Sequence, residues 1–258
     1  MSDRKRQVVD FLKAFETGAP EPLGIIDADN YTQHNLSAAD GLAGFRELTS
    51  QMPAGSVKVN TIRVLQDGDY VVAHSEFEIF GPITGFDIFR FSKGKIVEHW
   101  DNLQKSGGPN PSGNTMTDGS TAVTNLNQTA ENKALVRRFV DDVLVNERME
   151  KLPGYYHGDH YIQHNPQIAN GLSGLAAGLD AMRRAGITMK YDRIHAVFGE
   201  GNFVLVVSEG EFARKPASFY DLFRVENGKI SEHWDTIEAI PPRSEWRNQN
   251  GKFGFPGS

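Results

Sequence analysis

Residues 94–101 read Gly-Lys-Ile-Val-Glu-His-Trp-Asp, and residues 228–235 repeat this stretch as Gly-Lys-Ile-Ser-Glu-His-Trp-Asp. Three further blocks recur in the same order, namely residues 31–35 at 161–165, residues 41–44 at 171–174 and residues 86–90 at 220–224. The repeats of solenoid proteins are about 20–45 residues long. The two copies here are much further apart, which indicates duplication of a whole domain. We therefore expect two copies of one fold, each with its own core.

Each copy begins with a helical pattern and continues with strands. Apolar residues at helical spacing occur over residues 8–15 and again over residues 135–144. Segments rich in Val, Ile, Phe and Tyr follow, and turn dipeptides such as Lys93-Gly94 and Asn227-Gly228 separate them. Helices followed by a meander of antiparallel strands predict an α+β fold. We expect two tandem cone-shaped domains, each a curved antiparallel sheet wrapped on N-terminal helices, with a pocket inside.

The composition between the copies changes. Residues 106–128 are rich in Ser, Gly, Asn and Thr and lack periodic apolar positions, which is typical of a linker or an extended tail. The predicted domains are therefore residues 1–105 for the first copy and residues 129–258 for the second.

Charge and composition exclude several classes of function. The formal net charge is −6 and no run of Lys or Arg forms a stripe, so we expect no nucleic-acid partner. The chain has no cysteine, which excludes disulfides, thiolate metal sites and a cysteine nucleophile. No apolar run reaches the roughly 18 residues that a membrane span needs, and the first residues show no secretory pattern. We expect no membrane contact and a cytoplasmic location.

The last repeated block carries the residues best suited to chemistry. Alternate residues of a strand share a face, so His99 and Asp101 point together, as do His233 and Asp235. An imidazole and a carboxylate on one face can both reach a small molecule, and burial raises a carboxyl pKa towards the useful acid/base range. This pattern indicates a general acid/base site. A buried His–Asp pair that only ties the sheet to a helix remains an equally good interpretation.

Two more repeated blocks add candidates. His34-Asn35 recurs as His164-Asn165, so this position matters to the domain for structure or for function. Asp87 and Asp221 each precede an arginine by three residues on a strand, so the two charged side chains face opposite sides. We interpret each aspartate as a pocket candidate and each arginine as a structural ion-pair group.

Taken together, the motifs resemble the SnoaL-like polyketide cyclases of the nuclear-transport-factor-2-like superfamily over nearly the whole chain, twice. The resemblance implies an aspartate that acts as acid/base in an intramolecular aldol closure without a metal or cofactor, helped by a nearby histidine. Family members often carry two histidines, two residues apart, on the middle strand. The first copy keeps His74 there, with Glu76 in the second place, and the second copy has Val207 and Glu209.

We accordingly expect cofactor-free acid/base chemistry on a small hydrophobic carbonyl compound, either an aldol-type cyclisation or an isomerisation, with no metal. The expected catalytic residues are His34, His99, Asp101, His164, His233 and Asp235. The expected substrate-binding residues are Tyr31, Asn35, His74, Asp87, Tyr161, Asn165, Glu209 and Asp221. Hydrolysis of an epoxide or ester would use the same residue types, and a non-catalytic binding or scaffold module is the alternative from another class. Because domains of this family commonly dimerise, we also expect the copies to pack as an intramolecular pseudo-dimer.

Overall fold

The computed structural model describes residues 1–50 and 55–256, which form two compact units. Unit 1 comprises Met1–Lys105 together with Pro241–Pro256, and unit 2 comprises Ser106–Ile240. This division differs from the predicted domains at both tails. Residues 106–128 belong to unit 2, and residues 241–256 belong to unit 1 although they follow the second copy in sequence. Residues 257–258 of the predicted second domain lie outside the described residues.

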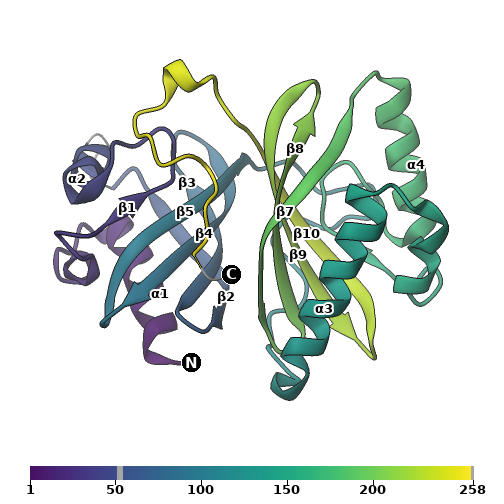
Figure 1. Ribbon diagram of the computed structural model, residues 1–258, viewed down its shortest axis with the longest axis horizontal. Coiled ribbons are helices and arrows are strands. Elements are labelled where there is room, and N and C mark those ends of the chain that lie inside the picture. The colour runs from purple at the N-terminus through teal and green to yellow at the C-terminus, as the bar shows by residue number, and fades with distance from the viewer. Residues whose placement is uncertain (51–54, 257–258) are drawn as a thin grey trace. The chain divides into compact units, whose positions relative to one another are not determined.

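Unit 1 is an α+β domain built on one five-stranded sheet (Figure 1). Its elements are helix α1 (Asp3–Thr17), a 3-10 turn (Glu21–Ile25), β1 (Thr32–Gln33), helix α2 (Gly41–Ser50), β2 (Lys58–Asp67), β3 (Tyr70–Glu78), β4 (Pro82–Ser92) and β5 (Lys95–Lys105). The strand order is β1-β5-β4-β3-β2. All neighbours are antiparallel except β1, which pairs with β5 in parallel. The predicted fold class is confirmed, with this short parallel strand as the addition.

Unit 2 repeats the plan. Helix α3 (Thr129–Phe139) continues as a π-helical turn (Val140–Val145) and is followed by a 3-10 segment (Met149–Tyr155), β6 (Ile162–Gln163), α4 (Gly171–Arg184), β7 (Met189–Glu200), β8 (Phe203–Phe212), β9 (Lys215–Glu226) and β10 (Lys229–Ala239). A short 3-10 turn at Leu126–Gln128 precedes α3, and another at Arg243–Glu245 belongs to the C-terminal segment of unit 1. The strand order β6-β10-β9-β8-β7 matches that of unit 1. Among the described residues, no helix is long and apolar enough to cross a membrane.

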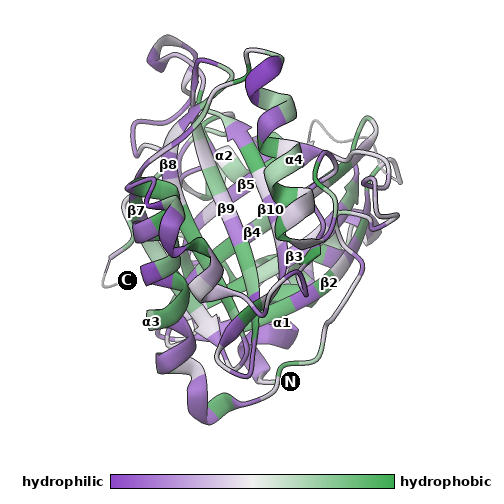
Figure 2. Cartoon of the chain, turned by 90° about the vertical axis from the view of Figure 1, so that its right-hand side faces the viewer, coloured by the Kyte–Doolittle hydropathy of each residue, from purple (hydrophilic) through white to green (hydrophobic). Residues whose placement is uncertain are grey.

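The first helix of each unit buries its apolar face on the concave side of the sheet. In unit 1, Phe11 of α1 packs edge-on against Phe89 of β4 and stacks on Phe45 of α2, with ring centroids 5.5 Å apart in both pairs. In unit 2, Phe139 of α3 packs in the same way against Phe223 of β9. Figure 2 shows hydrophobic residues beside hydrophilic ones along the helices, as an amphipathic helix on a sheet requires. Each unit therefore has its own core, as predicted.

The second glycine of the repeated Gly-Leu-x-Gly block allows a close approach between α2 and the preceding loop. A Cβ on Gly44 would lie 2.0 Å from the backbone oxygen of Ala39, and a Cβ on Gly174 would lie 2.4 Å from that of Ala169. We expect Gly44→Ala to destabilise the protein by about 1–3 kcal/mol, because backbone must move to admit the methyl group. Gly24→Ala is the matched control, since nothing lies within 4 Å of its Cβ position. Equal thermal midpoints for the two variants would contradict this packing.

Candidate active site

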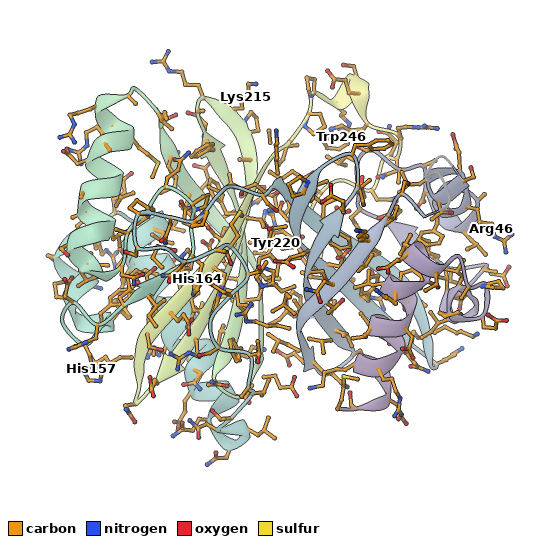
Figure 3. The ribbon with its side chains drawn as sticks, turned by 180° about the vertical axis from the view of Figure 1, so that it is seen from behind. Arg46, His157, His164, Lys215, Tyr220 and Trp246 are labelled. Atoms are coloured by element: carbon orange, nitrogen blue, oxygen red, sulfur yellow. The ribbon has the colours of Figure 1, made fainter. Side chains whose placement is uncertain are left out.

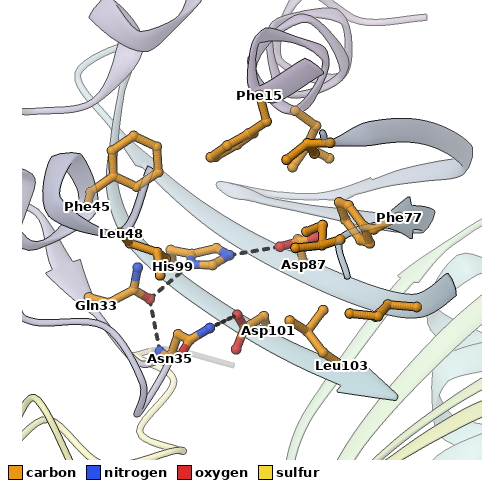
Figure 4. A pocket seen from close by; sticks show the side chains of 14 residues that line it. Phe15, Gln33, Asn35, Phe45, Leu48, Phe77, Asp87, His99, Asp101 and Leu103 are labelled. Carbon is orange, nitrogen blue, oxygen red and sulfur yellow. Dashed lines mark hydrogen bonds and ion pairs between the residues drawn. The ribbon is translucent and has the colours of Figure 1, made fainter. Parts of the chain in front are cut away.

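The pocket face of unit 1 carries an Asp-His-Asp cluster contributed by two neighbouring strands. His99 and Asp101 lie on β5, and Asp87 lies directly opposite Asp101 on β4. Nε2 of His99 is 3.0 Å from Oδ1 of Asp87, and both side chains are nearly buried (Figure 4). Unit 2 places His233, Asp235 and Asp221 in the same arrangement, with 3.0 Å between Nε2 of His233 and Oδ1 of Asp221. Strand alternation thus brings together the histidine and both aspartates.

A glutamine on β1 fixes the tautomer of the histidine. Oε1 of Gln33 accepts a hydrogen bond from the backbone N–H of Asn35 at 2.9 Å, and its amide nitrogen donates to the hydroxyl of Tyr31. Because a backbone N–H can only donate, the atom of the Gln33 amide that faces Asn35 must be the oxygen. Nδ1 of His99 contacts the same oxygen and must therefore donate its proton to it. Gln163 makes the equivalent bonds to His233, Tyr161 and Asn165. The sequence analysis did not select these glutamines, although both copies carry them in the same motif.

The second ring nitrogen of His99 shares a proton with Asp87. Nδ1 of His99 donates to Gln33, so the hydrogen bond between Nε2 and Oδ1 of Asp87 needs a separate proton. That proton is carried either by Nε2 or by Oδ1. Burial raises the pKa of Asp87, while the hydrogen bond and charge of His99 oppose that rise. Oδ2 of Asp87 is buried and has no hydrogen-bond partner among the described residues. The pair therefore holds a proton at the edge of the pocket and offers one unoccupied oxygen.

In unit 2 the pKa values of the histidine and of the second aspartate are raised. Burial opposes protonation of His233, but the hydrogen bond to Asp221 and the charges of Asp235 and Asp221 raise the pKa of His233 overall. Burial also raises the pKa of Asp235, against the opposing charge of His233. Coupled groups of this kind are typical of acid/base sites and also occur in structural networks.

An asparagine holds the second aspartate of each cluster. Oδ1 of Asn35 accepts from the backbone N–H of Ser37 at 2.8 Å, so its amide nitrogen is the group that donates to Oδ2 of Asp101. In unit 2, Nδ2 of Asn165 donates to Oδ2 of Asp235 at 2.7 Å. Each aspartate is therefore oriented by a neutral donor that cannot take up its proton.

The unit 1 cluster opens on a small apolar pocket. Its cavity has a volume of about 100 Å³. The polar lining residues are Gln33, Asn35, Asp87, His99 and Asp101, and the apolar ones are Leu12, Phe15, Phe45, Leu48, Val57, Phe77, Ile79, Ile83 and Leu103. Polar groups converge at one end of an apolar cavity, as in binding sites for small molecules.

Larger side chains surround the cluster of unit 2. Phe219 stands two residues before Asp221 on β9, where unit 1 has Gly85 two residues before Asp87. Tyr191 of β7 stacks on Phe219 with ring centroids 4.2 Å apart, and its hydroxyl donates to Oδ1 of Asp221 at 3.2 Å. The hydroxyl of Tyr191 thus contacts the unit 2 cluster, whereas in unit 1 Leu103 fills the space beside Gly85, with its Cδ2 2.4 Å from where a Cβ would stand.

The structure places His34 and His164 away from these clusters. Nε2 of His34 contacts Oε1 of Glu98 at 2.9 Å, and its ring stacks on Trp100 at 4.7 Å. Glu98 and Trp100 alternate with His99 along β5 and therefore lie on the opposite face of the sheet. His164, labelled in Figure 3, stacks on Trp234 in the same way and contacts Glu232. Because Gln33 pairs with His99, it shares the pocket face, and the next residue, His34, points to the opposite face.

His74 and Glu209, expected at the substrate, also face away from it. His74 stacks on Phe86 of β4 at 4.2 Å and contacts Arg63 at 3.2 Å. Phe86 precedes Asp87 and hence lies on the other face of β4. Glu209 forms an ion pair with Arg193 at 2.9 Å and contacts Nε2 of His195 at 2.8 Å, in register with Ser218 on the outer face of β9. The middle-strand positions were therefore assigned to the wrong face.

The arginines have the structural role that was expected of them. Arg90 contacts Glu98 at 2.6 Å, and Arg224 contacts Glu232 at 2.7 Å. Each ion pair joins neighbouring strands on the face opposite the cluster. Burial opposes ionisation of Glu232, but its hydrogen bonds to His164 and Arg224 lower the pKa of Glu232 to about 2.

The clusters place possible metal-ligating atoms close together, and in unit 1 the histidine and Asp101 among them are already engaged. Atoms of Asp87, His99 and Asp101 lie within 4.8 Å of one another. The same holds in unit 2 for Asp221, His233 and Asp235. Nδ1 of His99 donates to Gln33, Nε2 faces Asp87, and the ammonium group of Lys252 stands 3.4 Å from Oδ1 of Asp101. A metal ion would have to displace these contacts beside an existing cation, so we assign no metal to the cluster.

Comparison with known proteins identifies the family. The model of the SnoaL-like domain matches residues 8–99 and again residues 136–233. The chain therefore belongs to the SnoaL-like family, with two domains in tandem. The comparison with curated proteins gives no match.

Solved structures resemble single copies of the chain. TsrD from Streptomyces laurentii is 19% identical, with 40% of this chain and 91% of that chain covered at a TM-score of 0.34. IdmH, a putative polyketide cyclase from Streptomyces antibioticus, is 18% identical, with 40% and 93% covered at a TM-score of 0.35. A putative ketosteroid isomerase from Kribbella flavida is 18% identical, with 45% and 84% covered at a TM-score of 0.33.

Proposed function

We propose that this protein is an enzyme that moves protons on a small, mainly apolar carbonyl compound, in an aldol-type cyclisation or an isomerisation. One observation carries the proposal. A buried aspartate, Asp101, and a proton-holding pair, His99 and Asp87, line the same end of an apolar cavity. A base and an acid in one water-poor pocket are what enolisation requires.

The proposed reaction begins with Asp101. Its carboxylate takes a proton from the carbon next to the carbonyl, and the C–H electron pair becomes the enolate. Asp87 in its acid form, with the one proton of the pair on Oδ2, donates that proton or a hydrogen bond to the enolate oxygen, and it recovers the proton when the enol returns to the carbonyl. In an isomerisation, the proton on Asp101 returns to another carbon. In a cyclisation, the enolate carbon attacks a second carbonyl, whose oxygen then takes up a proton.

We place the reaction in unit 1. Its cluster opens on a cavity, whereas in unit 2 the hydroxyl of Tyr191 reaches Oδ1 of Asp221 and its ring stacks on Phe219. Oδ2 of Asp221 has no hydrogen-bond partner among the described residues, as is also true of Oδ2 of Asp87. In unit 2 the cluster then has a structural role.

Turnover of a panel of β-diketones, keto esters, epoxides and simple esters tests the proposal. We expect conversion of one or more carbonyl compounds and none of the epoxides or simple esters. Hydrolysis confined to epoxides or esters would replace the proposal with a hydrolase of the same fold. Tight binding of an apolar ligand without conversion of any compound would instead indicate a binding module.

A further inference from the structure

The C-terminal segment of unit 1 runs beside the active-site cluster. The amide nitrogen of Asn248 donates to the backbone oxygens of Asn35 and Ala38 at 2.7 and 3.0 Å. That of Asn250 donates to the backbone oxygen of Gln33 at 2.9 Å. These bonds attach residues 248–250 to the loop that follows β1, and so they determine where the next side chains lie.

Lys252 follows directly and reaches the proposed base. Its Nζ is 3.4 Å from Oδ1 of Asp101, and the two side chains are 3% and 4% exposed. The other oxygen of Asp101 accepts from the amide of Asn35. Both oxygens of this aspartate therefore accept from donors, one of which is a cation. Both contacts are made by the deprotonated carboxylate.

A matching segment in unit 2 lacks the lysine. The amide of Asn114 donates to the backbone oxygen of Gln163, as that of Asn250 does to Gln33 in unit 1. The next residue, Thr115, offers its backbone oxygen to Nδ1 of His164 at 2.8 Å. Gly251 has this place beside His34 in unit 1. Met116 follows Thr115 in unit 2, and Lys252 follows Gly251 in unit 1. A buried thioether in unit 2 therefore corresponds to the ammonium group of unit 1.

We propose that Lys252 is a positioning residue for the reaction, and that its ammonium group keeps Asp101 in the carboxylate form that a base requires. The proposal rests on the function proposed above and explains why only one copy carries a base. Met116 cannot supply a charge, so Asp235 has only its neutral asparagine donor and the neighbouring histidine. The segment that completes the site lies about 150 residues from the base along the chain.

The surroundings of the two aspartates agree with this inference. Asp101 faces Asp87 on β4, His99 on its own strand, Tyr31 before β1 and Lys252 on the C-terminal segment. With the Asp87–His99 pair neutral overall, Lys252 balances the one remaining negative charge. A buried carboxylate without a partner is costly, whereas a paired one is tolerated.

Asp235 faces a different set of groups. Asp221 and His233 belong to its cluster, and Tyr161 and Tyr191 approach it from the loop before β6 and from β7. Oδ1 of Asp235 has no hydrogen-bond partner among the described residues. Burial raises the pKa of Asp235, as expected for a carboxyl group without a lysine.

A carbon-13 NMR titration of the aspartate carboxyl groups tests the inference without any substrate. In Lys252→Met, we expect the titration midpoint of the Asp101 carboxyl to rise by about 1–3 pH units, the range for loss of an adjacent cation. Lys252→Arg should keep the parental midpoint, because the charge remains. Met116→Lys is the reciprocal variant and should lower the midpoint of Asp235, so the inference stays testable if Lys252→Met does not fold.

Turnover gives the second readout. The acidic limb of the pH–rate profile of Lys252→Met should shift to higher pH together with the Asp101 midpoint. The acidic limb of Lys252→Arg should stay at the parental pH. An Asp101 midpoint unchanged in folded Lys252→Met would overturn the inference, whatever the turnover. A midpoint that moves in a protein that converts no substrate would support the role of Lys252 and refute the proposed function.

Discussion

Asp101→Asn should lower turnover of the carbonyl substrate on the order of 10²–10⁴-fold, the range for loss of a general base. The amide keeps the size of the carboxyl group but cannot take up a proton. Asn35 can still bond to the oxygen of the new side chain, but the buried ammonium group of Lys252 loses its carboxylate partner, so we expect a folded variant with a lower thermal midpoint. Steady-state kinetics on a compound that the parent converts, with the thermal midpoint as a check on folding, measures the effect.

Asp235→Asn is the matched control. We expect about the parental rate from it, because Tyr191 contacts the unit 2 cluster and no Lys or Arg of the described residues forms an ion pair with Asp235. The double variant should then resemble Asp101→Asn. If Asp235→Asn carried the loss instead, the reaction would belong to unit 2. If the folded double variant kept the parental rate, neither aspartate would be the base.

Asp87→Asn should lower kcat by a similar factor, again on the order of 10²–10⁴-fold. The carboxyl group shares its proton with Nε2 of His99 and has one unoccupied oxygen towards the pocket. An amide still meets the ring nitrogen but cannot transfer a proton to an enolate oxygen. The effect should fall on kcat more than on KM, because the lost interaction develops in the transition state.

Asp221→Asn is the control for this prediction and should leave kcat close to the parental value. A large rise in KM with unchanged kcat for Asp87→Asn would show that Asp87 only binds the substrate. The pH dependence adds a further check. Burial raises the pKa of Asp87, so its acid form persists to higher pH than that of an exposed aspartate, and the basic limb of the rate profile should disappear in the variant.

Much of the fold could be predicted from the sequence because the chain contains its own comparison. The repeated block at 94–101 and 228–235 fixed the number of copies, and the order of helical and strand patterns fixed the class. The parallel strand β1 could not be predicted, because two residues are too few for alternation to be visible.

The candidate site was predicted where strand alternation is regular. His99 and Asp101 share a face because they stand two apart on an uninterrupted part of β5. His34 was misassigned because its orientation depends on β1, and Gln33 was overlooked for the same reason. His74 lies on a regular strand, but only the resemblance said which face of that strand would meet the pocket.

Lys252 could not be found from the sequence by any local signal. It lies in a segment without regular structure, and that segment was assigned to the second copy, whereas it belongs to unit 1. Its correspondence with Met116 appears only when hydrogen bonds are compared, since the two segments share little more than asparagines and a glycine. Contacts between distant parts of a chain are what local sequence patterns leave undetermined.

Deuterium exchange at the carbon next to the carbonyl tests the central claim most directly. The protein is incubated in D₂O with the diketones and keto esters of the panel, and proton NMR follows the loss of each α-proton. We predict exchange that the parent protein catalyses without an added cofactor and that Asp101→Asn loses while Asp235→Asn keeps it. Binding of these compounds in the unit 1 pocket without faster exchange than in buffer would contradict the account.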